Sequence, residues 1–140
     1  MVQFGPLFAS TRSATVCSAT ASNDMRQLFQ HHPVTGYYFV PGLRARIIHE
    51  AGGYIVQTNS AGFRSKHEFR TAKDRGTKRI LLFGDSFTAG DGVSNADRYS
   101  DLLETLAPGL EVFNYAIPGT GTDQQYLAYR EFAQDKRRAA

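Results

Sequence analysis

A short apolar run that ends in Gly-Asp-Ser constrains the fold of this chain most strongly. Residues 80–83 are Ile-Leu-Leu-Phe, and Gly-Asp-Ser follows at 84–86. A continuous apolar run of this length predicts a strand over residues 79–83 that is covered on both faces, as in a parallel sheet. Gly84 permits a tight turn, so Asp85 and Ser86 are expected just beyond the carboxyl end of that strand, where open α/β sheets bind their ligands. The pattern therefore predicts an exposed Ser86 hydroxyl.

A second strand-to-loop transition follows further along the chain. Residues 111–115 predict another strand, and Ala-Ile-Pro-Gly-Thr-Gly follows at 116–121. Glycines at this point indicate a turn that opens a helix. A glycine pair between a strand and a helix also begins the dinucleotide-binding fingerprint, so a nucleotide-binding α/β half-domain that uses Gly119 and Gly121 is an alternative, although Gln124 occupies the third glycine position.

The two blocks resemble the first and second signature blocks of the SGNH/GDSL ester hydrolases. The resemblance covers residues 84–90 and 114–124. It implies a three-layer α/β/α, flavodoxin-like fold and no cofactor. It also implies that Ser86 is the nucleophile, that the amides of Ser86 and Gly119 form an oxyanion hole, and that Gly84 and Asp85 support them. The implied substrate is an acyl ester of a small molecule, carbohydrate or lipid, which is hydrolysed or transferred.

Later blocks of that family are absent from the residues after Ser86. A serine hydroxyl needs a base to take its proton, and the resemblance implies a histidine in an Asp-x-x-His block and an asparagine in a Gly-x-Asn-Asp block. Neither motif follows Ser86, and all four histidines precede it. The sequence predicts the amino-terminal half of the family domain, truncated after the second strand-helix unit and incomplete or inactive as it stands. We expect such a unit to require a complementary carboxyl-terminal fragment or self-association.

Two amphipathic helices are expected around these strands. Ser94-x-x-Asp97 resembles a capping box, and large apolar residues then recur at helical spacing, at Tyr99, Leu102, Leu103 and Leu106. This stripe predicts packing against the sheet, so its side chains are expected in the core. A second helix is predicted from Thr122, capped by Gln125, with one apolar side formed by Tyr126, Tyr129, Phe132 and Ala133.

Composition divides the chain into three parts. Residues 1–30 are predicted to be a disordered leader, because the first 23 residues are rich in Ser, Thr and Ala and lack acidic residues. Residues 31–77 form an extension with a short hairpin, the motif Asn-Ser-x-Gly-Phe-Arg at 59–64, and a charged linker over 66–78 that is expected to be solvated. Residues 78–140 are the α/β part. An extension of this kind resembles that of some SGNH/GDSL members.

Other classes of site are not favoured. Cys17 is the single cysteine and falls in the leader, which excludes disulfides and thiolate zinc sites. His31 and His32 are adjacent and badly placed to share a metal. The net charge of +3 comes from dispersed basic residues, so nucleic acid is not an expected partner. The sequence has no run long enough for a signal core or a membrane span, and cytoplasm is the default location.

Overall fold

The structure is a computed structural model that describes residues 28–49 and 52–138. Two antiparallel hairpins come first: β1 (Phe29–His32) pairs with β2 (Gly36–Phe39), and β3 (Arg44–Ile47) pairs with β4 (Tyr54–Gln57). Residues 1–27 of the predicted leader lie outside the described residues. Residues 28–30 of that predicted leader are described, and they are ordered: β1 begins at Phe29, and Val40 N donates to Leu28 O.

The edge of β4 is covered by a 3-10 turn, η2 (Asn95–Asp97). Ser94 Oγ accepts from Ile55 N at 3.1 Å, and the Asn95 side-chain amide bonds both the N–H and the carbonyl of Gln57. Ser94 precedes η2 but makes no side-chain capping bond. The predicted capping box is therefore wrong, because this hydroxyl satisfies a strand edge instead of a helix end.

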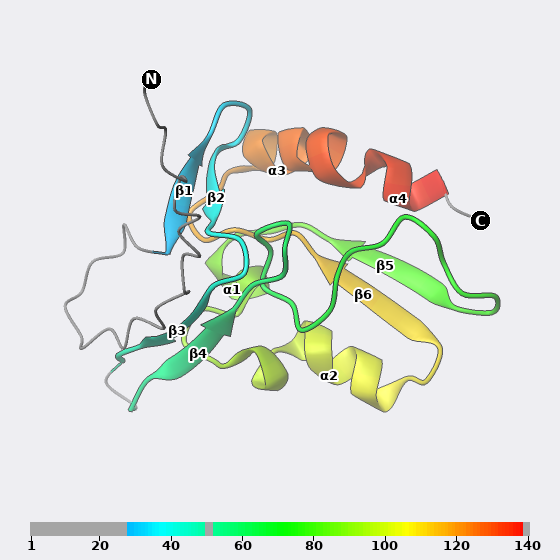
Figure 1. Cartoon of the computed structure of the whole chain (residues 1–140), viewed down its shortest axis with the longest axis horizontal. Coiled ribbons are helices and arrows are strands. Elements are labelled where there is room, and N and C mark those ends of the chain that lie inside the picture. Colours follow the sequence, from blue (N-terminus) through cyan, green and yellow to red (C-terminus); the bar gives the residue numbers. More distant parts are fainter. Residues whose placement is uncertain (1–27, 50–51, 139–140) are drawn as a thin grey trace, which may run out of the picture.

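A parallel pair lies at the centre of the α/β part. β5 (Lys78–Leu82) pairs with β6 (Leu110–Asn114), with Ile80 opposite Val112. Figure 1 shows α2 (Tyr99–Leu106) on one face of this pair and α3 (Thr122–Ala128), η3 (Tyr129–Ala133) and α4 (Gln134–Arg138) on the other, while α1 (Ser86–Ala89) lies between the pair and the two hairpins. The fold is thus mixed α/β, with one small parallel sheet and two small antiparallel sheets.

An aromatic core joins the extension to the parallel pair. Phe63 and Phe69 are buried together with Phe113, Tyr115 and Ile117. The Phe69 ring stacks on Phe113 with 4.4 Å between centroids. The prediction that residues 66–78 form a solvated linker is therefore wrong at Phe69, because this one aromatic side chain carries the segment into the core.

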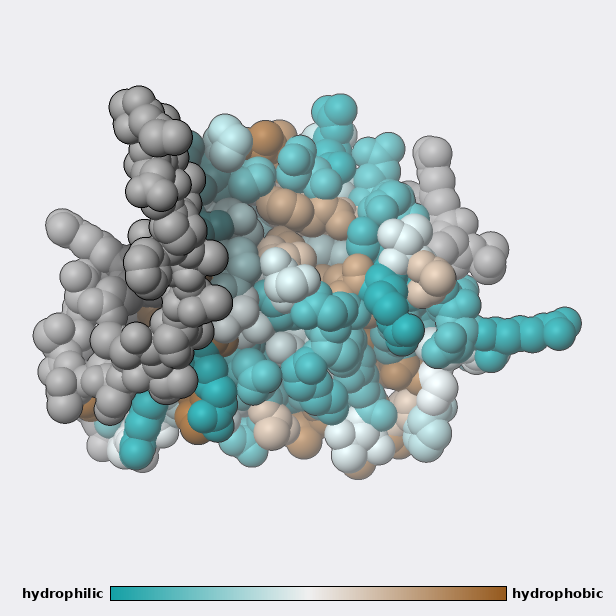
Figure 2. Space-filling view, viewed as in Figure 1, coloured by the Kyte–Doolittle hydropathy of each residue, from teal (hydrophilic) through white to brown (hydrophobic). Residues whose placement is uncertain are grey.

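The apolar stripe of α2 is on the surface. Its side chains are 38–78% exposed, whereas the buried residues of the helix are Ser100 and Asp101. Figure 2 shows hydrophobic side chains along the border of the molecule where α2 lies in Figure 1. The prediction that Tyr99, Leu102, Leu103 and Leu106 belong to the core is wrong. The polar side of α2 faces inward because its buried side chains are hydrogen-bonded there: Asp101 bonds Arg98, and Ser100 Oγ accepts from Asn114 Nδ2.

The last helical segment changes its phase partway. Between α3 and α4 the chain makes a π-helical turn, η3, and the residues buried on either side of this change are Ala128 and Ala133. Tyr126 is 59% exposed, so it does not share a buried side with Ala133 as a uniform period predicts. The helix cap also differs by one residue from the prediction: Gly121 N donates to Gln124 Oε1 at 3.1 Å.

Candidate active site

Ser86 is the first residue of α1, directly after the turn that ends β5. Asp85 is the N-cap of this helix, and its Oδ1 accepts from Phe87 N at 3.0 Å. Gly90, at φ 76°, ends the helix, and Asp91 N donates to Ser86 O at 2.9 Å. The Ser86 side chain is half-buried, and its Oγ has no hydrogen-bond partner among residues 28–49 and 52–138. The hydroxyl is therefore available to a reacting group.

The carbonyl of Gly84 ties the two signature blocks together. It accepts from Ile117 N and from Thr120 Oγ1, each at 3.2 Å. Gly84 also has no room for a side chain, because a Cβ there would collide with Thr88. The loops after β5 and β6 consequently meet at the same end of the parallel pair.

Gly119 lies in the second of these loops, in a turn from Ile117 to Thr120. Its φ is 78° and it is exposed. Within the described part of the chain, neither the Ser86 N–H nor the Gly119 N–H donates a hydrogen bond. Two unsatisfied amides on adjoining loops are the kind of donors that an oxyanion hole requires. The Gly121 N–H, in contrast, is occupied by Gln124, which does not favour the nucleotide-binding alternative.

Asn114 connects α1 to the sheet and to α2. It is buried at the end of β6, and its Nδ2 donates to Thr88 O at 2.7 Å and to Ser100 Oγ at 3.1 Å, while its Oδ1 accepts from Ala116 N. Its position directly after the apolar part of the second strand is the sequence signal for such a role. The sequence patterns alone predict no role for it.

Two buried arginines hold the end of α1. Arg64 donates to the carbonyls of Ala89 and Gly90 at 2.9 and 2.8 Å, and to Val93 O at 2.8 Å. Arg98 donates to Arg64 O at 2.7 Å and pairs with Asp101. Burial lowers the pKa of Arg64 to about 10, which still leaves its guanidinium charged at neutral pH. Burial likewise lowers the pKa of Arg98.

The extension therefore holds α1 from two directions. Arg64 is the last residue of the Asn-Ser-x-Gly-Phe-Arg motif, and this motif is the sequence signal that could have identified it. From β4, the Tyr54 hydroxyl donates to Asp91 Oδ1, next to the cap of α1. Burial, followed by the bond to Asp91, raises the pKa of Tyr54 to about 12.

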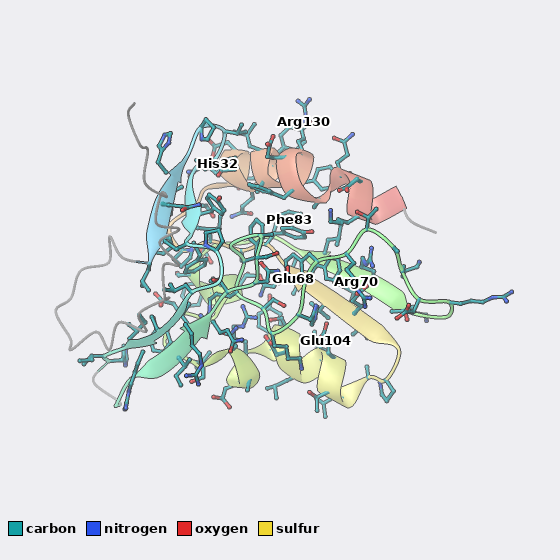
Figure 3. The ribbon with its side chains drawn as sticks, viewed as in Figure 1. His32, Glu68, Arg70, Phe83, Glu104 and Arg130 are labelled. Atoms are coloured by element: carbon teal, nitrogen blue, oxygen red, sulfur yellow. The ribbon has the colours of Figure 1, made fainter. Side chains whose placement is uncertain are left out.

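Two of the described histidines, His67 and His32, make their side-chain contacts away from Ser86. His67 Nε2 lies 3.0 Å from Oε1 of Glu104, which is labelled in Figure 3. The same oxygen accepts from Val112 N at the outer edge of β6. His32 Nδ1 lies within hydrogen-bond reach of Thr35, and its ring packs against Phe132. Within residues 28–49 and 52–138, His31, His32 and His67 make no hydrogen bond to Ser86. The candidate site therefore combines an unbonded serine hydroxyl with two unbonded amides, and among the described residues no histidine hydrogen-bonded to Ser86 is found.

The described residues offer no other obvious ligand chemistry. They contain no group of three His, Cys, Asp or Glu residues placed to hold a metal ion. Over the same residues, no helix has the length and apolar character needed to cross a membrane.

Comparison with known proteins gives a family match. Residues 80–140 match the model of the family described as GDSL-like Lipase/Acylhydrolase. This match starts in β5 and includes both signature blocks. The curated proteins contain no match to the chain.

Proposed function

We propose that residues 80–140, which match the GDSL-like Lipase/Acylhydrolase family model, supply the nucleophile and the oxyanion hole of a serine ester hydrolase or acyl transferase. Ser86 is the proposed nucleophile, and the amides of Ser86 and Gly119 are the proposed oxyanion donors. Gly84 and Asp85 support them, because one joins the two loops and the other caps α1. We infer further that the parallel pair belongs to a three-layer, flavodoxin-like sheet, whose other strands would pair along the free edge of β5.

The proposed reaction has two steps. Ser86 Oγ bonds to the acyl carbon while its proton passes to a base, and the carbonyl oxygen takes on negative charge between the two amides. The ester C–O bond then breaks, and the leaving alcohol takes a proton. Water or a second alcohol next attacks the acyl-serine, which releases the acyl group and restores the hydroxyl.

One observation carries the proposal. The Ser86 and Gly119 amides are both without an acceptor among the described residues, and both lie on loops that the Gly84 carbonyl holds together at the carboxyl ends of β5 and β6. An amide N–H that makes no hydrogen bond within its own loop can donate one to a substrate oxygen. The missing element is the base, so we propose that the chain by itself turns over esters slowly.

Hydrolysis of p-nitrophenyl acetate tests this proposal when added imidazole stands in for the base. Without imidazole, we expect the wild-type chain to be no faster than Ser86→Ala, because loss of the base typically costs orders of magnitude in rate. At equal imidazole concentration, the wild type should exceed Ser86→Ala, and mass spectrometry should find an acetyl group on Ser86. Ser60→Ala, which removes an exposed hydroxyl bonded to Glu68, is the matched control and should behave as wild type.

Two results would count against the proposal. Equal rates for wild type and Ser86→Ala in imidazole, with no acetylated Ser86, would show that Ser86 is not a nucleophile. Ser86-dependent turnover without imidazole would show that the chain contains its own base. Single substitutions of His31, His32, His49 and His67 to Gln would then identify it.

A further inference from the structure

The peptide between Pro118 and Gly119 has two possible orientations, and the structure holds one of them. Thr120 N donates to Ile117 O at 3.4 Å, Pro118 occupies the second turn position, and Gly119 has φ 78° at the third. These are the features of a type II turn; a type I turn would need a negative φ at Gly119. The two types differ by a flip of the central peptide, which reverses the direction of the Gly119 N–H.

A side chain from the extension holds that peptide. Tyr37, in β2, donates its hydroxyl proton to Pro118 O at 2.6 Å, across 81 positions of sequence. The peptide bond is trans, so its carbonyl and its N–H point in opposite directions. With its carbonyl bound to Tyr37, the peptide directs the Gly119 N–H away from the hairpin.

The rest of this contact is built around the same hydroxyl. A Cβ on Gly119 would lie 2.9 Å from Tyr37 Oη, so a side chain there would crowd the hydroxyl and disturb its hydrogen bond to Pro118 O. The hairpin itself is attached to α3, because Gln124 Nε2 donates to Thr35 O at 3.0 Å. The Tyr37 ring packs edge-on against Phe29, which restricts where the hydroxyl can lie.

We propose that Tyr37 is a positioning residue for the oxyanion hole. Its hydroxyl keeps the Pro118–Gly119 peptide in the orientation that presents the Gly119 N–H to the substrate oxygen. It also polarises the peptide, because a carbonyl that accepts a hydrogen bond makes the N–H of the same peptide a stronger donor. This inference rests on the proposed function for its catalytic meaning, whereas the coupling between Tyr37 and the Gly119 amide does not.

The coupling is tested by nuclear magnetic resonance of the full chain. Tyr37→Phe removes the hydroxyl and keeps the ring. The matched control is Tyr38→Phe in the same strand, which loses a bond from Gln30 Nε2 at 2.6 Å, and among the described residues its hydroxyl makes no hydrogen bond to the second block. In Tyr37→Phe we expect the Gly119 amide nitrogen to shift upfield by more than any amide outside the hairpin, and the contact between Pro118 Hα and the Gly119 amide hydrogen to weaken. Both signals should be unchanged in Tyr38→Phe.

Ester cleavage in imidazole tests the catalytic part. Tyr37→Phe should lower the Ser86-dependent kcat roughly two- to tenfold, the effect of one hydrogen bond, with KM unchanged. Tyr38→Phe should keep the wild-type kcat even if both variants lose similar thermal stability. An unchanged Gly119 resonance in Tyr37→Phe would overturn the coupling. A shifted resonance with a wild-type kcat would overturn the positioning role. Loss of all Ser86-dependent rate already in the wild type would instead be a failure of the proposed function, and the resonance would still decide the coupling.

Discussion

The two faces of the β5–β6 pair are covered by opposite kinds of side chain. On one face, Phe113 and Tyr115 pack with Phe63 and Phe69 beneath η3. On the other, α2 directs Ser100, Asp101 and Glu104 inward and its large apolar residues outward. The polar face is stable because its buried groups have partners, which removes the cost of taking them out of water. The periodic apolar stripe of α2 therefore identifies a helix, but the hydrogen-bond partners available to its polar side chains determine which side of the helix is buried.

The largest expected effect is on the aromatic face. Phe113→Ala should lower the free energy of unfolding by about 3–5 kcal/mol, because the ring is fully buried and leaves a cavity between Phe69 and the sheet. Urea unfolding followed by near-ultraviolet circular dichroism measures this. Phe87→Ala is the control, since that ring is 87% exposed. A loss below about 1 kcal/mol in Phe113→Ala would mean that this face is not the main core.

An intermediate effect should separate two buried tyrosines. Tyr54 donates to Asp91, whereas the Tyr115 hydroxyl is buried without a partner among the described residues. At neutral pH, Tyr54→Phe should cost about 0.5–1.5 kcal/mol, and Tyr115→Phe should be neutral or stabilising. Equal losses in the two variants would contradict the assignment of partners.

Alkaline titration sharpens the same contrast. A tyrosine in the unfolded chain loses its proton near pH 10, whereas the pKa of Tyr54 is raised to about 12 in the folded state. Its stabilising contribution is thus complete below pH 10 and is lost as the pH rises towards 12. Burial raises the pKa of Tyr115 in the same direction. The fall in unfolding free energy with rising pH should be shallower in Tyr54→Phe and in Tyr115→Phe than in the wild type.

The smallest effect is expected on the outer side of α2. Leu102→Gln with Leu106→Gln should change the free energy of unfolding by no more than about 0.5 kcal/mol, because both side chains are exposed. The same double variant should bind less of a hydrophobic dye such as ANS and associate less. A fall of several kcal/mol in the free energy of unfolding would instead show that these leucines are buried in a core, as their helical spacing predicts.

The elements near Ser86 follow from local sequence rules, whereas their packing does not. The two parallel strands lie one residue earlier than predicted, and the loops after them meet because parallel strands end at the same edge. No local rule reveals that Arg64 reaches the carbonyls of α1 or that Tyr37 reaches Pro118, because these bonds join positions 25 and 81 residues apart. The burial of Phe69 does not follow from local sequence rules either, because a segment rich in charged residues can still bury a single aromatic ring.

The π-helical turn of η3 limits how this helix can change in length. Ala128 and Ala133 are both buried although they are five residues apart, a separation that a straight α-helix would turn about 140° beyond a full rotation. The wider turn takes up one additional residue. Deleting one residue of Tyr129–Ala133 would therefore let the turn close as α-helix with α4 nearly in phase, whereas a second deletion would rotate α4 by about 100°. That rotation would remove the Lys136 carbonyl from Arg79 and the Asp135 carboxylate from Thr71. A change of length that η3 cannot accommodate would consequently break contacts at the amino-terminal end of β5 rather than within the helix itself.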